Sequence, residues 1–374
     1  MNLKKTVIFF SALILFGLGL FVAYRETTSQ FDEFKYLFKI KATNNHVSED
    51  IIFYEARIKR DRLGAVEPAI LAGLFLERFK LTASNEDYAM SEQYARMSLK
   101  NRKAFNTAAN LVLADLAQAK HHFREALNQA NEIKKTHSGE AAIYPILIKS
   151  YLALGNLDAA LASANTFIQI MPSTLSYTFR ALVHQALSKN SEAFNDFQKA
   201  LKMEEPGHLA ESIWTRNLLG RFLAEQKKFE AADFVLSENL RLSNKDALTY
   251  GNLAILEENQ KHFIKAETYF QKAFSLSKQI TYMLGESRMK MALNSANAIQ
   301  FEKMAESLLR QELATDGMGH RSELIKLLLS RQSEDNSVEL LKLARDEVNS
   351  RPNAESQKLL ALVQIKVQYA SIRL

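Results

Sequence analysis

The side chains that most often carry chemistry are sparse in this sequence. It contains no Cys, which excludes disulfides, thiolate metal sites and a cysteine nucleophile. Its eight His are scattered, and no HExxH run or His/Asp cluster has the spacing of metal ligands. The adjacent pair His121–His122 falls in an expected turn between helices, where solvent exposure is the ordinary state. We therefore expect no metal site and no cofactor.

No motif of a common enzyme class is present either. The sequence lacks the GxGxxG and GxxxxGK[ST] loops that hold phosphates and the GxSxG turn that presents a nucleophilic serine. The adjacent carboxylates Glu204–Glu205 and Glu257–Glu258 would point about 100° apart on a helix, so they make poor acid–base pairs. We predict a protein that is not an enzyme and has no evident small-molecule substrate. A site assembled from distant helices is the alternative.

The charge pattern gives little support to a polyanionic partner. The 374 residues include 48 Lys and Arg and 42 Asp and Glu, a formal net charge of +6, and the two signs are interspersed. No basic stripe with interleaved aromatic residues, the usual signature of a nucleic-acid surface, is present. We expect a solvated mixed surface and no nucleic-acid partner; attraction to anionic lipid or nucleic acid is the lesser alternative.

The elements that would position binding residues are clearest between Ala141 and Pro172. Residues 144–151 and 157–167 each repeat apolar side chains every three or four positions, which is typical of helices. Gly155 stands where the first helix must stop, and Pro172 where the second must already have ended. The stretch predicts a helical hairpin, and neither of its helices can bury an apolar face alone.

This hairpin recurs along the chain. Its central alanines are Ala126, Ala160, Ala193, Ala232 and Ala266, at intervals of 34, 33, 39 and 34 residues. A helix–turn–helix unit with a period near 34 resembles the tetratricopeptide repeat (TPR) family. The residues that carry the resemblance are, in chain order, Leu147, Tyr151, Gly155, Ala160 and Pro172; Ala181, Ala193, Phe197 and Ala200; Leu219, Gly220, Phe229 and Ala232; and Leu253, Ala254, Phe263, Ala266, Phe270 and Ala273.

The resemblance implies an all-α fold, a right-handed α-solenoid of helix–turn–helix repeats. The uncharged residues 6–24 predict one transmembrane helix before it. The 39-residue step contains Pro206 and Gly207, which predict a longer connection there. First helices are expected to begin near Thr107, Ala141, Thr174, Ile213 and Ala247. The predicted divisions are a transmembrane anchor at 1–25, a connector at 26–47, degenerate repeats at 48–106, TPR-like repeats at 107–280, and degenerate repeats with a capping helix at 281–374.

The first residues predict the membrane anchor. Residues 6–24 are uncharged and as a helix would span about 28 Å, close to the thickness of a bilayer's hydrocarbon core. A cleaved signal peptide is the alternative, although Phe21 and Ala23 form a poor small-x-small cleavage pattern. Lys4 and Lys5 favour a cytoplasmic N-terminus and extracytoplasmic repeats, periplasmic in a bacterium. Basic residues also follow the span, and basic residues favour the cytoplasmic side of a membrane, so cytoplasmic repeats are the alternative.

The connector carries four hydrophobic residues with helical spacing, Phe31, Phe34, Leu37 and Phe38. Two structures fit this pattern. One is a short amphipathic helix lying at the membrane surface. The other is a segment whose aromatic side chains pack on the first repeat.

In the TPR family the first helices of the hairpins line a concave surface, and the resemblance implies which side chains face it. Projected by register, the candidate partner-binding residues are Lys149, Gln185, Trp214, Asn217, Arg221 and Glu258, with Asp115, Gln118, Thr178, Glu225 and Asn259 beside them. For Trp214 the alternative is packing between repeats, and for the others it is a solvated face. Some members of the family bind the C-terminal carboxylate of a partner with a clamp of basic and Asn side chains. Here the projected groove also contains acidic residues, so the sequence does not support such a clamp.

These observations lead to three functional hypotheses. The first is a membrane-anchored scaffold that binds a protein or peptide on its concave face. The second is a regulator or adaptor in envelope or surface-polysaccharide assembly, because a span followed by TPRs resembles in outline the lipopolysaccharide assembly protein B family. That family ends in a Cys-rich metal module, which this chain lacks. The third is an enzyme with an unrecognised site.

Overall fold

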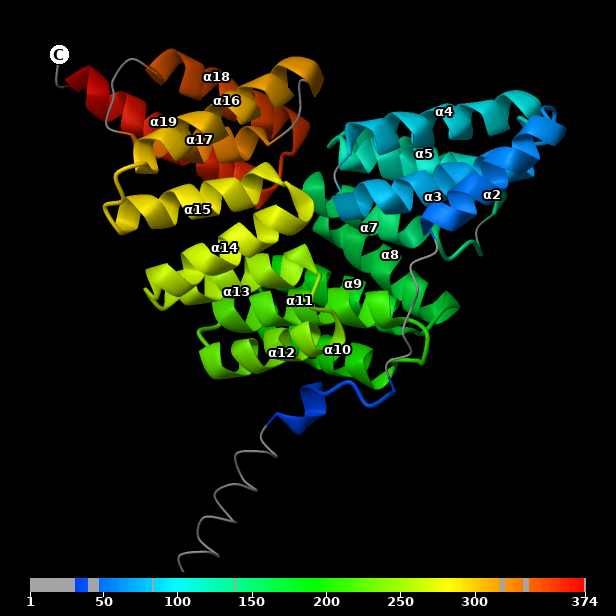
Figure 1. Cartoon of the computed structure of the whole chain (residues 1–374), viewed down its shortest axis with the longest axis horizontal. Helices are drawn as coiled ribbons and strands as arrows, with labels where there is room; N and C mark the ends of the chain where they lie inside the picture. The colour runs from blue at the N-terminus through cyan, green and yellow to red at the C-terminus, as the bar shows by residue number, and fades with distance from the viewer. Residues whose placement is uncertain are drawn as a thin grey trace, which may run out of the picture.

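The computed structural model describes residues 31–39, 47–82, 84–137, 139–316, 320–331 and 336–372. Within these ranges the chain forms eighteen α-helices, one short 3-10 helix and no strand. Figure 1 shows the helices stacked as successive antiparallel hairpins along a curved path. The expected all-α solenoid of helical hairpins is therefore confirmed for the described part of the chain.

Each hairpin pairs an inner helix with the outer helix that follows it. The inner helices are α3 (Val66–Thr82), α5 (Thr107–Ala119), α7 (Ile143–Ala153), α9 (Thr174–Ala186), α11 (Leu209–Glu225), α13 (Ala247–Asn259), α15 (Ile280–Ala292) and α17 (Arg321–Ser330). The outer helices are α4 (Asn85–Asn101), α6 (Phe123–Thr136), α8 (Leu157–Ile170), α10 (Asn190–Lys202), α12 (Phe229–Leu242), α14 (Phe263–Ser277), α16 (Ala298–Asp316) and α18 (Ser337–Ser350). A leading helix, α2 (Val47–Arg60), and a final one, α19 (Ala354–Ile372), flank them.

The curvature follows from which helices touch. From α3 to α15, each inner helix packs against the next inner helix, whereas consecutive outer helices do not pack closely on one another. The inner helices therefore lie on the shorter, concave side and the outer helices splay apart. Small side chains permit the close approach within hairpins, since Ala126, Ala160, Ala193, Ala232 and Ala266 are all fully buried.

The same tight turn closes six of the hairpins. One residue in each turn has a left-handed backbone with φ between 53° and 74°. The next amide N–H bonds the carbonyl oxygen five residues earlier at 2.8 or 2.9 Å, the Schellman arrangement that ends a helix. The left-handed residues are His121, Gly155, Ser188, Lys227, Lys261 and Asn294, and their spacing follows the repeat period.

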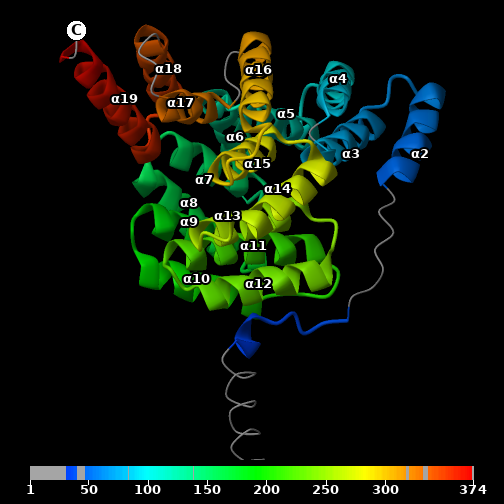
Figure 2. The same cartoon turned by 60° about the vertical axis from the view of Figure 1, so that its left-hand side comes forward.

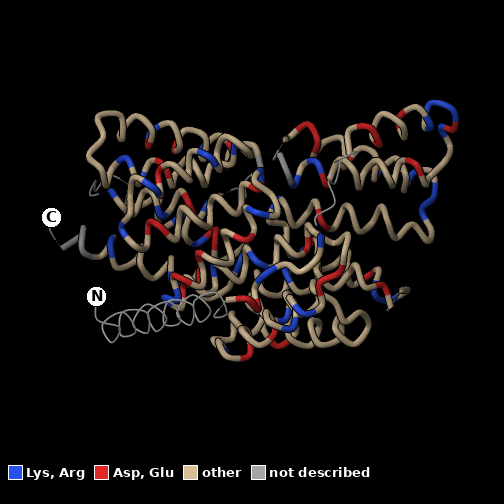
Figure 3. Tube along the Cα trace, turned by 60° about the horizontal axis from the view of Figure 1, so that its bottom comes forward, with Lys and Arg blue, Asp and Glu red and all other residues tan. Residues whose placement is uncertain are grey.

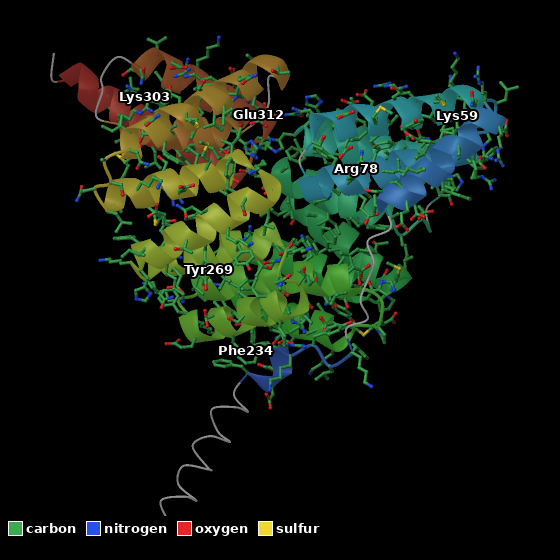
Figure 4. The ribbon with its side chains drawn as sticks, viewed as in Figure 1. Lys59, Arg78, Phe234, Tyr269, Lys303 and Glu312 are labelled. Atoms are coloured by element: carbon green, nitrogen blue, oxygen red, sulfur yellow. The ribbon has the colours of Figure 1, made fainter. Side chains whose placement is uncertain are left out.

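Residues 31–39, called the strap below, lie in the furrow between outer helices α10 and α12. The strap contains the 3-10 helix η1 (Asp32–Phe34), and Phe34 is only 2% exposed. The Phe31 ring lies 5.4 Å from that of Phe234, and the Phe34 ring 6.4 Å from that of Phe194. Figure 1 shows η1 at the lower end of the molecule, and Figure 4 shows Phe234 beside it. The expectations of packing on the first repeat and of a surface amphipathic helix here are both wrong, because the splayed outer helices offer a deeper apolar furrow.

The solenoid curves enough for its C-terminal hairpins to meet its N-terminal ones, along a line of contact called the seam below (Figure 2). The Asn353 side chain donates to the Ala153 carbonyl oxygen at 3.3 Å, and the Arg124 guanidinium donates to that of Asn349 at 3.3 Å. A cavity of about 720 Å³ lies in the seam and is lined by α4, the α5–α6 turn, the α14–α15 turn, α16 and His320. The chain thus closes on itself through a small number of contacts.

Helix α11 begins at Leu209, four residues before the expected Ile213, because the extra residues of the long repeat add a helical turn as well as a longer connection. No helix among the described residues is long and apolar enough to cross a membrane. The predicted span at 6–24 lies outside the described residues.

Candidate functional site

The inner face carries a ladder of polar contacts between successive helices. Lys80 of α3 and Lys149 of α7 both reach Asp115 of α5, at 2.6 and 3.4 Å. Burial tends to raise the pKa of Asp115, but the two lysines outweigh it and hold that pKa below its usual value. Desolvation in the concave surface, together with the charge of Lys80, lowers the pKa of Lys149 despite its attraction to Asp115. Lys149 is thus a groove cation already tied to its neighbours.

The ladder continues with side chains that reach solvent. Gln185 of α9 donates to Glu225 of α11 at 2.6 Å, and Arg221 approaches the same carboxylate at 3.9 Å. Glu258 of α13 accepts two bonds from Arg288 of α15, at 3.0 and 2.9 Å. The structure therefore brings the predicted Gln185 and Arg221 together at Glu225. It places Lys149 and Glu258 on the same face but in separate contacts.

Trp214 and Asn217 occupy different surroundings from the other predicted residues. Trp214 is partly buried, with its ring 5.1 Å from that of Phe179, so it packs between repeats. The Asn217 side-chain amide is buried and donates to Asp246 at 2.9 Å. The Asn252 amide donates to Oδ1 of Asn217 at 3.0 Å and to the Asn217 backbone carbonyl oxygen at 3.1 Å. Both side chains join α11 to its neighbours.

Two other residues of the projected register are also structural. Gln118 is buried and donates to the Ile146 carbonyl oxygen at 2.6 Å and to Ser150 at 2.8 Å. The Thr178 hydroxyl is buried against that of Thr215 at 2.8 Å. These bonds hold consecutive inner helices in register.

The ladder is interrupted between α15 and α17, which do not pack closely on each other in the described structure. A pocket of about 530 Å³ opens at this break. Leu284 and Met291 of α15 and Leu327 of α17 supply apolar walls, and Arg288 and Lys326 stand at its rim. Sequence reasoning missed this pocket, because the pocket arises from the spacing of two helices and not from any local motif. We call it the α15/α17 pocket.

The charges around the α15/α17 pocket are largely compensated. Arg331 meets Glu302 at 2.7 Å and Glu306 at 2.6 Å. Burial tends to raise the pKa of Glu306, but Arg310 and Arg331 outweigh it and lower that pKa. Exposed apolar surface framed by satisfied charges is suited to seating a hydrophobic side chain of a protein segment.

Nothing in the described structure points to metal chemistry. Across the described ranges, no group of three or more His, Asp and Glu side chains is arranged to hold a metal ion. Acidic and basic residues are interspersed along the described part of the trace (Figure 3).

Comparison with known proteins supports the fold. No known family profile matches the chain. Anaphase-promoting complex subunit 3 of Dictyostelium discoideum is 33% identical over 92 residues, which is 25% of this chain and only 9% of that protein. The crystal structure of the APC/C hetero-tetramer Cut9–Hcn1 matches 87% of this chain and 61% of the other, at 12% identity and a TM-score of 0.54. PilW, described as a type IV pilus biogenesis factor, matches 55% of this chain and 96% of its own, at 21% identity and a TM-score of 0.45. On the Cut9–Hcn1 similarity, the fold of this chain is that of a TPR-like solenoid.

Proposed function

We propose that this chain is a membrane-anchored scaffold that binds a protein partner, or a peptide segment of one, along its inner face. The observation that carries the proposal is the continuous inner surface of contacting helices that ends in the α15/α17 pocket. Arg221 is exposed before the pocket, and Met291 supplies exposed apolar surface within it. The mechanism is positioning of the partner, without bond chemistry.

The membrane part of the proposal rests on the uncharged residues 6–24 and the preceding Lys4 and Lys5. With a cytoplasmic N-terminus, the repeats lie on the extracytoplasmic side. Confinement to the membrane would raise the effective concentration of the scaffold for a partner in the same envelope. Protease added to outer-permeabilised cells carrying a C-terminal tag tests the side. Digestion of the tag supports the proposal, and protection until the inner membrane is opened places the repeats in the cytoplasm.

A matched pair of methionines tests the binding face. Met291 lies in the α15/α17 pocket and is 45% exposed, whereas Met304 lies on outer helix α16 and is 47% exposed. A photo-crosslinking side chain at Met291 or Arg221 should trap one and the same protein in cells, and the same group at Met304 should not.

The partner identified in this way permits a quantitative measurement. Met291→Glu should weaken its binding by about tenfold or more, because it places a charge on the apolar wall of the pocket. Met304→Glu should leave the affinity unchanged, and neither substitution should shift the melting temperature appreciably. Equal crosslinking from Met291 and Met304, or equal affinities of the two variants, would show that the inner face is not the binding surface.

A further inference from the structure

Specific hydrogen bonds to buried charged side chains hold the strap against the solenoid. Arg216 of α11 is fully buried, and its guanidinium is paired with Glu204, with one nitrogen at 3.0 Å from Oε2. The Nε of Arg216 donates to the Phe34 carbonyl oxygen at 3.0 Å. A buried guanidinium requires all its donors to be satisfied, so the strap backbone completes this site.

A second contact set holds the following residues of the strap. The Tyr36 amide donates to Glu238 of α12 at 2.8 Å, and the Arg241 guanidinium donates to the Tyr36 carbonyl oxygen at 3.4 Å. Burial tends to raise the pKa of Glu238, but Arg241 and the Tyr36 amide outweigh it and hold that pKa low. Tyr36 is itself buried. The strap is thus fixed at two successive points by backbone and side-chain contacts.

The length of chain before the strap limits where a membrane anchor can lie. If residues 6–24 span the bilayer, as proposed above, seven Cα–Cα steps separate Tyr24 from Phe31, and they reach about 25 Å at most. An undocked strap would instead leave residues 25–46 as the tether. Twenty-three steps from Tyr24 to Val47 would then reach about 80 Å. Docking therefore changes a long tether into a short one.

We propose that the strap turns the outer surface of α10 and α12 toward the bilayer and fixes the solenoid in one orientation on the membrane. This inference rests on the proposed anchor. Helices α4, α16 and α18 then lie at the end of the molecule away from the bilayer, opposite η1 in Figures 1 and 2. The α15/α17 pocket lies toward that distal end, so the segment it binds belongs to a soluble protein or a soluble domain.

The absence of Cys in the chain makes the orientation measurable with single engineered cysteines. Lys202→Cys on α10 and Lys342→Cys on α18 replace exposed lysines at the two ends. The full chain, labelled with a donor dye, is reconstituted into phosphatidylcholine vesicles that carry an acceptor dye on the headgroups. Energy transfer should be higher from position 202 than from position 342.

Substitutions in the strap test its docking on α10 and α12 without changing the proposed anchor at 6–24. Phe34→Ala should abolish the difference between the two positions, whereas Leu37→Ala should preserve it because Leu37 is 84% exposed. A Gly/Ser insertion of about ten residues between 28 and 29 leaves the strap intact but should reduce transfer from position 202, because it adds about 35 Å of reach. This insertion keeps the test valid if Phe34→Ala prevents folding, which circular dichroism would reveal.

The outcomes for the two proposals differ. A chain that does not float with the vesicles would overturn the anchor and, with it, the proposed membrane-bound function. A chain that floats but transfers energy equally from positions 202 and 342, or that is unaffected by the insertion, would overturn the orientation and leave the anchor standing.

Discussion

Four side chains of α11 show how position on one helix decides the role of a residue. Trp214 packs between repeats, Arg216 is buried beneath the strap, Asn217 bonds α13, and Arg221 is exposed near Glu225. Successive residues differ by about 100° around the axis, so neighbours in sequence meet different surroundings. Removing one member of the buried Arg216–Glu204 pair would cost about 3–5 kcal/mol. Arg216 is therefore a structural residue of α11.

Gly155 is constrained both by its backbone and by the seam. Its φ is +74°, and an added Cβ would lie 2.7 Å from the Pro352 carbonyl oxygen. Gly155→Ala should destabilise the protein by at least about 1–2 kcal/mol, the usual cost of a left-handed backbone with a Cβ. A lower urea midpoint by circular dichroism would show this.

Gly73→Ala is the matched control for that substitution. No atom lies within 4 Å of a Cβ built at Gly73, which sits inside helix α3. This change should stabilise the protein by about 0.5–1 kcal/mol, because alanine favours a helix interior. If Gly155→Ala were neutral or stabilising as well, the strain assigned to the Gly155 turn and its contact with Pro352 would be wrong.

At the scale of the element, periodicity was sufficient to predict the hairpins. The starts expected at Thr107, Thr174 and Ala247 coincide with the observed starts of α5, α9 and α13. Periodicity is local, and one repeat contains all the residues that determine its two helices. The turns were less visible, because only Gly155 among the six left-handed residues is a glycine.

The hairpin of α13 and α14 carries a pH-dependent contact. Glu257 accepts from His262 at 2.8 Å and from Lys265 at 2.5 Å. Burial tends to raise the pKa of Glu257, but the two partners outweigh it and lower that pKa below its usual 4.5. A lowered folded-state pKa means that the unfolded chain takes up the proton first as pH falls. The contact therefore stabilises the fold at neutral pH, and this contribution is lost as pH falls through the folded-state pKa.

Glu257→Gln tests this contact. The variant should be less stable than the parent at pH 7, and the difference in free energy of unfolding should shrink as pH falls below about 4.5, the ordinary glutamate value. Urea unfolding at several pH values measures it. A difference that stays constant from pH 7 to pH 4 would show that ionisation of Glu257 contributes nothing.

At the scale of the whole molecule, the features that escaped prediction are those that depend on distant parts of the chain. The strap meets Glu238 across 202 residues of sequence, and Asn353 meets Ala153 across 200. The α15/α17 pocket depends on how far two helices stand apart. The repeat register was enough to predict which residues lie on the inner helices. It could not predict that Asn217 is buried, because that depends on its contact with the Asn252 amide on the next inner helix.

The seam predicts a measurable change in shape. Arg124→Ala combined with Asn353→Ala removes two hydrogen bonds across it, each of which contributes about 0.5–1.5 kcal/mol. Spin labels at Arg96→Cys on α4 and Lys342→Cys on α18 should then report a longer and broader distance distribution between the two ends.

Lys135→Ala is the control for the seam. Lys135 is an exposed residue of α6 whose ion pair is with Glu132 on the same helix. The Lys135→Ala substitution should leave the distance distribution between the two spin labels unchanged. Identical distributions for the parent and the Arg124/Asn353 double variant would mean that these bonds do not hold the ends together.

The strap also affects the order in which the molecule can be made. Most helices meet neighbours in the next hairpin, so hairpins can form one after another as the chain emerges during synthesis. The strap, although it precedes helices α2 to α12 in the chain, has no furrow to occupy until Arg241 at the end of α12 has been added. Until then Phe31, Phe34 and Tyr36 have no apolar surface of their own to cover them. The strap is therefore synthesised before the furrow that it occupies, and it can reach its final place only after α12 has been made.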